Sequence, residues 1–287
     1  MSFSTIYLQQ PTELEAHFVK RFQEIRESIR TEKAGSAAKD VHEAFFKLND
    51  HLLSDLVEKA SDPHWVGDNL HRYGLQPGQQ IAYNIDFLRN RHHAVYLGAG
   101  LIVEVASPEC PSRVLKKTLT DKCVGLSTLR MFVLDGIRMK FYDKDAQIGF
   151  YRVRHAGRTF DGAASIERAR SYLRKTHGKF TYNYLRNNCE HGACFIATGE
   201  SRSDQLRRFN PFLTQSSQYV RMAVALEFSE ANKKAKRLRL KTQEDWGRWC
   251  AKKKDADYAI PDHPDEVYHK RGWQSWDEWL GTDWHDF

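Results

Sequence analysis

Long apolar segments are missing from this chain of 287 residues. No stretch approaches the roughly 20 consecutive apolar residues that a membrane-spanning helix needs. The opening residues, MSFSTIYLQQPTELEA, lack the apolar run after a basic start that marks a secretory signal peptide. We therefore expect a cytoplasmic protein with no transmembrane segment, whose contact with a membrane would be peripheral or through a partner.

Cysteine is scarce, and its pattern does not suggest a disulfide framework. The five cysteines are irregularly spaced: Cys110, Cys123, Cys189, Cys194 and Cys250. In an intracellular chain this pattern indicates reduced thiols. A zinc site that combines His191 with the first four of these cysteines is an alternative, but the spacings C-x12-C and C-x-H-x-x-C differ from the paired knuckles of structural zinc sites. We expect no metal and no other cofactor.

The formal net charge of +7 and the pI near 9.1 suit anionic partners such as lipid headgroups, RNA or DNA, but do not choose among them. The basic segment Lys233–Lys241 concentrates this charge. Such a run is most often a solvated helix face, and it is also a candidate for peripheral membrane contact or nucleic-acid contact.

Two apolar stripes with helical spacing open the chain. Apolar residues recur every three to four positions from Leu14 to Ile29 and again from Val41 to Leu56, with a break at AGSAA, residues 34–38. The pattern predicts an N-terminal helical hairpin that packs but carries no chemistry.

After Leu75, β-branched and aromatic residues become frequent, which predicts a mixed α+β region. The expected strands are 79–86, 92–98, 101–106, 131–136 and 149–156. The expected helices are 163–177, 189–198 and further helix over 201–230. Gly178 and Gly199 are placed to end the first two of these helices.

Cys189 is the candidate nucleophile, because it stands where a loop ends and a helix begins. Backbone N–H groups and the helix dipole favour a thiolate at such a position and can also hold an oxyanion. Asn187 or Asn188 is a suitable N-cap. The base should be a histidine from elsewhere in the fold, and His92 and His93 open a predicted strand. Adjacent strand positions face opposite ways, so only one of these two can point at the thiol.

Four segments between about Leu75 and Arg207 resemble LRAT-like proteins, the family of lecithin:retinol acyltransferase and the small phospholipase/acyltransferases. They are QPGQQIAYNI, HHAVYLGAGLIVEVA, FYRVRH and the block from SIERARSYLRKTHGKF to NNCEHGACFIATGE. The resemblance implies a circularly permuted papain-like α+β fold, an antiparallel sheet with a nucleophile helix.

The same resemblance implies Cys189 as nucleophile and His92 as general base, with attack on a lipid or other acyl ester through an acyl-thioester. Glu104 stands where the family has its second histidine. A carboxylate there can orient His92 and stabilise its imidazolium, although Glu104 could also be an exposed strand residue. Tyr182 and Asn188 are expected to help build the site.

The C-terminal segment is rich in tryptophan. Six of the seven tryptophans lie between Trp246 and Trp284, and TQEDWGRWCAKKK with IPDHPDEVYHKRGWQSWDEWLGTDW resembles the integrase repeat unit. The association of that repeat with integrases and helicases suggests nucleic-acid or protein docking. We expect Trp273, Trp276 and Trp279 to form the core of a small module, with base stacking as the alternative.

The sequence therefore predicts four parts: a helical hairpin (1–70), an LRAT-like catalytic domain (71–210), a basic helical linker (211–240) and a Trp-rich module (241–287). The favoured function is a cysteine-dependent acyltransferase or hydrolase. Two alternatives stay open: a papain-like cysteine peptidase or amidase, and an inactive papain-like module that docks nucleic acid or protein through the tail.

Overall fold

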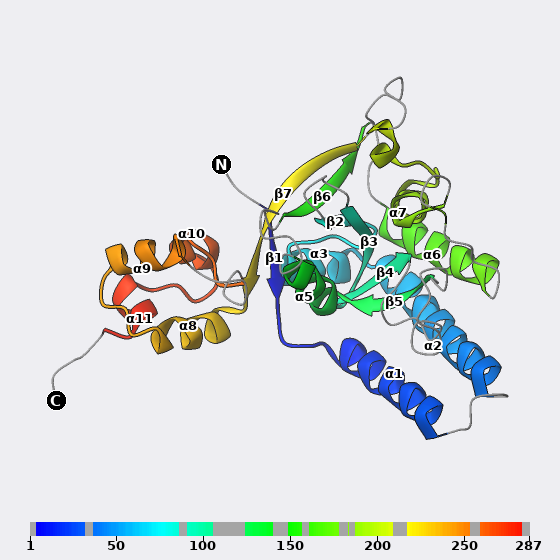
Figure 1. Ribbon diagram of the computed structural model, residues 1–287, viewed down its shortest axis with the longest axis horizontal. Helices are drawn as coiled ribbons and strands as arrows, with labels where there is room; N and C mark the ends of the chain where they lie inside the picture. Colours follow the sequence, from blue (N-terminus) through cyan, green and yellow to red (C-terminus); the bar gives the residue numbers. More distant parts are fainter. Residues whose placement is uncertain are drawn as a thin grey trace.

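The computed structural model describes residues 4–31, 37–85, 91–105, 124–139, 149–156, 161–177, 183, 187–208, 217–252 and 259–282. Within these residues the strands are β1 (Ser4–Leu8), β2 (Gln80–Asn84), β3 (Arg91–Gly98), β4 (Leu101–Val105), β5 (Val124–Thr128), β6 (Phe150–His155) and β7 (Ser217–Leu226). They form one curled sheet in the order β1-β7-β6-β2-β3-β4-β5. All neighbouring pairs are antiparallel except β1 with β7 (Figure 1).

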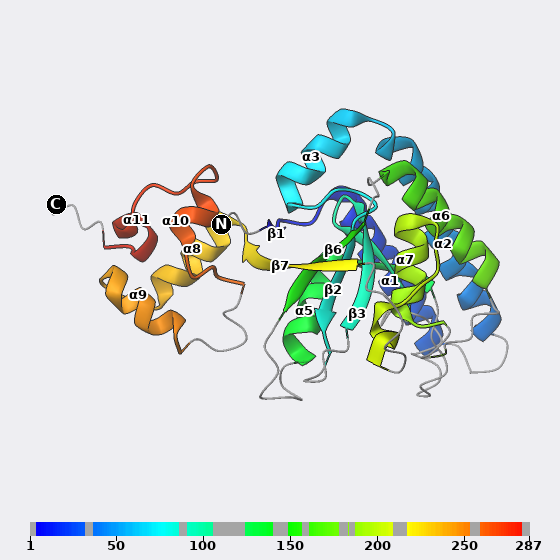
Figure 2. The same cartoon turned by 90° about the horizontal axis from the view of Figure 1, so that it is seen from above.

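The helices of the main body are α1 (Glu13–Thr31), α2 (Ala37–Ala60), α3 (Pro63–Tyr73), α5 (Leu129–Met139), α6 (Gly162–Thr176) and α7 (Cys189–Thr198), followed by the 3-10 helix η1 (Asp204–Arg208). Helices α2, α6 and α7 cover one face of the sheet and α5 the other (Figure 2). This arrangement places the start of α7 beside β3, the strand that begins with Arg91 and His92.

Each sheet face has its own apolar core, because side chains alternate along the strands. Val95 and Val103 pack with Cys189 under the helices. On the other face Tyr96 and Phe132 belong to a cluster that also contains Trp246 and Trp279 of the C-terminal segment. Side chains at alternate positions of residues 92–98 and 101–105 therefore fill the cores on both sides of the sheet.

The N-terminal helices follow the predicted stripes. Phe22 on α1 packs edge-on against Phe45 on α2, with ring centroids 5.4 Å apart. Helix α2 in turn lies along α6, where Asp50 pairs with Arg170 and Arg174 at 3.0 and 2.7 Å. Helices α1 and α2 thus extend the layer that α6 and α7 form over this face of the sheet.

Two predicted elements are wrong. Residues 131–136 belong to helix α5 and not to a strand. A short apolar run does not distinguish a buried strand from a buried helix, and Phe132, Val133 and Ile137 bury one helical face. Residues 217–226, within the segment expected to be a helical linker, form strand β7. Its partners are β1 and β6, which come from distant parts of the chain and leave no local signal.

The C-terminal segment continues from the end of β7 (Figure 1) and contains α8 (Phe228–Arg237), α9 (Gln243–Cys250), α10 (Pro264–Tyr268) and α11 (Trp276–Leu280). Trp246 and Trp279 are buried, and Trp273 and Trp276 are half-buried against them. The expected Trp-rich core is therefore present, and Trp246 completes it. The division of the chain into four domains stays a prediction.

Candidate active site

Helix α7 begins at Cys189, as predicted. Asn188 is the N-cap, since its Oδ1 accepts hydrogen bonds from the backbone N–H groups of Glu190 (2.9 Å) and His191 (3.0 Å). The backbone N–H of Asn188 donates to Nδ1 of His191 at 3.4 Å, which completes a capping box. Gly199 ends the helix at φ 84°. These contacts hold the Cys189 thiol at the positive end of the helix, where a thiolate is favoured.

His92 and Glu104 lie on adjacent strands and point to the same side. Ala94 pairs with Glu104 in the antiparallel register, and His92 is two residues before Ala94. His92 Nε2 lies 2.5 Å from Glu104 Oε2, and Glu104 is only 2% exposed. Glu104 is therefore a buried carboxylate aimed at His92, and not the exposed strand residue that the sequence also allowed.

His92 also contacts the Cys189 thiol. Burial alone would lower the pKa of His92, but hydrogen bonds to the Cys189 thiol and the Glu104 carboxylate together outweigh it and raise that pKa from 6.5 to about 10. The imidazolium is thus the stable form at neutral pH. Cys189 Sγ also lies 3.6 Å from the carbonyl oxygen of Arg91, to which it donates. The structure brings Cys189, His92 and Glu104 together in one chain of contacts.

His93 points to the opposite face of the sheet from His92, as strand alternation requires. It is fully buried, and burial lowers the pKa of His93 to about 4 in spite of the nearby Glu190 carboxylate. Its Nδ1 lies 2.9 Å from Nε2 of Gln80. His93 is therefore a neutral ring at neutral pH, and of the two histidines His92 is the one in contact with the thiol.

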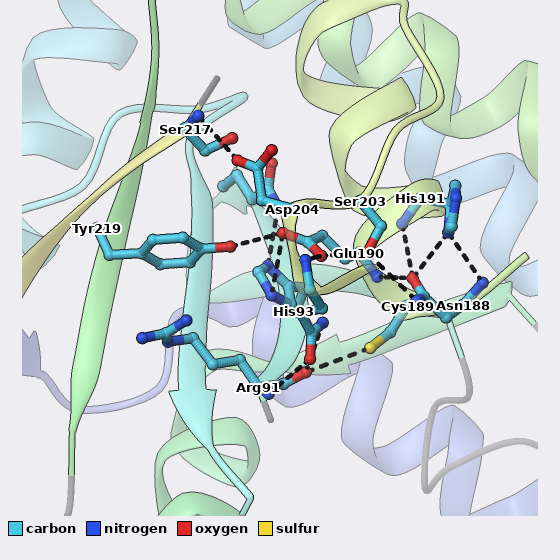
Figure 3. Close-up of polar contacts among 12 residues, drawn as sticks. Arg91, His93, Asn188, Cys189, Glu190, His191, Ser203, Asp204, Ser217 and Tyr219 are labelled. Carbon is cyan, nitrogen blue, oxygen red and sulfur yellow. Dashed lines mark hydrogen bonds and ion pairs between the residues drawn. The ribbon is translucent and has the colours of Figure 1, made fainter. Parts of the chain in front are cut away.

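A buried carboxylate directly after Cys189 organises the other side of the candidate site (Figure 3). Glu190 is 2% exposed and accepts hydrogen bonds from Ser203 Oγ, from Tyr219 OH at 2.5 Å and from the backbone N–H of Gln205 at 2.9 Å. Burial would raise the pKa of Glu190, but these hydrogen-bond donors stabilise its carboxylate and hold that pKa below its usual value. Glu190 therefore ties α7 to η1 and β7.

Sequence reasoning missed Glu190 and its partners. The available signal was a glutamate in the first turn of helix α7, which commonly reflects nothing more than the helix dipole. Ser203 and Tyr219 lie 13 and 29 residues further along the chain, so their approach to Glu190 depends on the fold.

A family model described as lecithin retinol acyltransferase matches residues 74–202, a span that contains His92, Glu104 and Cys189. Residues 74–202 are an LRAT domain. No family model matches the Trp-rich segment, and neither the curated proteins nor the solved structures yield a significant match. The integrase-repeat resemblance of that segment therefore stays a prediction.

The LRAT domain implies a permuted papain-like fold, in agreement with the sheet and helix α7 seen here. It also implies cysteine-dependent acyltransferase or phospholipase chemistry, without naming a substrate. Within this LRAT domain the partner of His92 Nε2 is a carboxylate, Glu104.

Of the residues named from the sequence, Tyr182, Cys110, Cys123, Trp284 and the predicted C-cap Gly178 lie outside the described residues. In the part of the chain that the structure describes, no group of three His, Cys, Asp or Glu side chains could hold a metal ion. Cys194 is buried on α7, and burial raises the pKa of its thiol, which fits a packing role. No helix among the described segments is long and apolar enough to cross a membrane.

Proposed function

We propose that this protein is a cysteine-dependent acyltransferase or hydrolase that forms an acyl-thioester on Cys189. The observation that carries the proposal is the contact chain from the Cys189 thiol through His92 to the buried Glu104, at the first residue of a capped helix inside an LRAT domain. A thiolate, a base and a group that orients the base are the parts that nucleophilic cysteine catalysis requires.

In the first half-reaction the Cys189 thiolate attacks the carbonyl carbon of an acyl ester, and the carbonyl electron pair moves onto oxygen. The backbone N–H of Cys189 lies at the helix N-terminus, and we assign it to this oxyanion. The intermediate collapses to the thioester, and the leaving alkoxide takes its proton from the His92 imidazolium. Glu104 stabilises that imidazolium before the transfer and keeps the ring oriented.

In the second half-reaction the now neutral His92 removes a proton from the acceptor. If the acceptor is water, the product is a free acid; an alcohol or amine gives acyl transfer. Attack on the thioester carbon expels the Cys189 thiolate, and the protonated His92 restores the starting pair.

A lipid ester is the substrate class that we infer, and the basic segment Lys233–Lys241 is where we expect an anionic lipid surface to make contact.

Intact-mass spectrometry after exposure to phospholipids, activated esters and matching amides tests the proposal. Wild-type protein is expected to gain the mass of one acyl chain, and Cys189→Ala and His92→Ala are expected to lose that gain. Cys194→Ala is the matched control, because it removes a buried thiol from the same helix and should still acylate. If no ester yields an adduct, and Cys189 is alkylated no faster than Cys194 near neutral pH, the thiol-enzyme proposal is wrong. Acylation by the amides alone would favour an amidase.

A further inference from the structure

Gln205 connects the two segments that carry the reactive pair. It lies on η1 and is only 6% exposed. Its side-chain amide bonds both backbone groups of Arg91: Oε1 accepts from the Arg91 N–H at 2.9 Å, and Nε2 donates to the Arg91 carbonyl at 3.2 Å. Gln205 therefore binds the first residue of β3 as a neighbouring strand would, immediately before His92.

The backbone of Gln205 holds the other segment. Its N–H donates to Glu190 Oε2 at 2.9 Å, and Glu190 immediately follows Cys189 on α7. Ser203 and Tyr219 donate to the same carboxylate. One residue thus contacts the neighbour of the base and the neighbour of the nucleophile.

The Arg91 carbonyl is the point where these contacts meet. It accepts the Nε2 bond from Gln205 and also the 3.6 Å bond from Cys189 Sγ. The Arg91 side chain is fixed separately, with its guanidinium over the rings of Tyr219 (4.1 Å) and Tyr151 (4.9 Å). The orientation of the peptide between Arg91 and His92 therefore depends on Gln205, and this peptide sets where the imidazole lies relative to the thiol.

We propose that Gln205 is a positioning residue that holds His92 and Cys189 at reactive spacing through Arg91 and Glu190. The inference rests on the proposed function, because a reactive spacing between His92 and Cys189 has meaning only if Cys189 is the nucleophile. A displacement of about 1 Å between reacting groups can cost about 10²-fold in rate, so loss of this contact is expected to slow Cys189 by about 10- to 100-fold.

The variants Gln205→Met and Gln205→Glu test the inference. Methionine keeps the volume but removes both bonds to Arg91. Glutamate keeps the acceptor for the Arg91 N–H but sets a carboxylate oxygen against the Arg91 carbonyl, and it serves if the methionine variant does not fold. Gln79→Met is the matched control, because Gln79 is also a buried glutamine (4% exposed) whose side chain accepts one backbone hydrogen bond, away from the pair.

The measurement is the rate of Cys189 alkylation by iodoacetamide against pH, read by peptide mass spectrometry on full-length protein well below its unfolding temperature. Both Gln205 variants are expected to react more slowly near neutral pH, with a profile shifted to higher pH, while Gln79→Met behaves as wild type. A Gln205→Met profile equal to that of Gln79→Met, with wild-type Cys189 still far more reactive than Cys194, would overturn the positioning role alone. Wild-type Cys189 no more reactive than Cys194 would overturn the proposed function itself.

Discussion

Replacing Glu104 by Gln should weaken catalysis by removing the charge that stabilises the His92 imidazolium while keeping the shape of the side chain. Each pKa unit corresponds to about 1.4 kcal/mol, so the rise from 6.5 to about 10 represents roughly 5 kcal/mol in favour of the imidazolium. Hydrogen bonds to charged groups typically contribute about 1.5–3 kcal/mol. Loss of that contribution predicts acylation slowed by about 10- to 100-fold.

The pH dependence of the Glu104→Gln variant gives the sharper test. In wild type the imidazolium persists until the pH passes about 10, so acylation should fall only on that alkaline side. Without the carboxylate the pKa of His92 is expected to drop, and the alkaline fall should move toward neutral pH.

The assay is single-turnover acylation by an activated ester between pH 6 and 11, followed by rapid-quench mass spectrometry. The comparison variant is Glu104→His, which introduces the residue that the LRAT-like family has at this position. It should retain more activity than Glu104→Gln. A Glu104→Gln protein with the wild-type rate and pH profile would refute the assigned role of Glu104.

Two further substitutions test how the body is held together. Burial raises the pKa of Glu15 from 4.5 to about 7 against the attraction of Arg130. The folded state should therefore lose about 3 kcal/mol of unfolding free energy as the pH rises through this interval, and Glu15→Gln should abolish that loss. Denaturant titrations in which the unfolding free energy of wild type and Glu15→Gln changes equally with pH would contradict this. A Cβ on Gly192 would lie 2.2 Å from Val105 Cγ2, so Gly192→Ala should cost about 1–3 kcal/mol of unfolding free energy. Gly247→Ala, where a Cβ meets nothing within 4 Å, is the control, and equal effects at both positions would show that α7 does not need this close approach to β4.

The contact between Cys189 and His92 could be predicted only in part from local signals. The N-cap at Asn188 and the C-cap at Gly199 mark the limits of α7. Strand alternation indicates that only one of His92 and His93 can face the thiol, and the choice of His92 rests on the family resemblance. Glu104 could be named only because it stands where the family that the sequence resembles has its second histidine. Its contact with His92 depends on the β3–β4 register, which a turn at residues 98–101 sets.

What could not be predicted depends on contacts between distant segments. Strand β7 joins the sheet between β1 and β6, with Met222 opposite both Ser4 and Phe150. No short window of sequence contains both partners, so the sequence alone predicts helix for these residues. Tyr219 lies on this strand, and the Glu190 network could not be seen without it.

Strand β7 also links the candidate active site to the Trp-rich segment, which predicts how the chain unfolds. Tyr219 reaches Glu190, while Leu226, at the other end of the strand, accepts a hydrogen bond from Tyr268 OH at 2.7 Å and donates one to Ala259 O at 2.8 Å. Trp279 is fully buried in a cluster that includes residues of β1 and β7.

Because that cluster is shared, Trp279→Ala should lower the unfolding free energy of the whole chain by about 3–5 kcal/mol. Calorimetry should record a single transition, shifted to lower temperature, with loss of Cys189 reactivity at the same temperature. A separate early transition that leaves Cys189 reactive would show instead that the Trp-rich segment is an independent folding unit, as the predicted boundary near residue 240 requires.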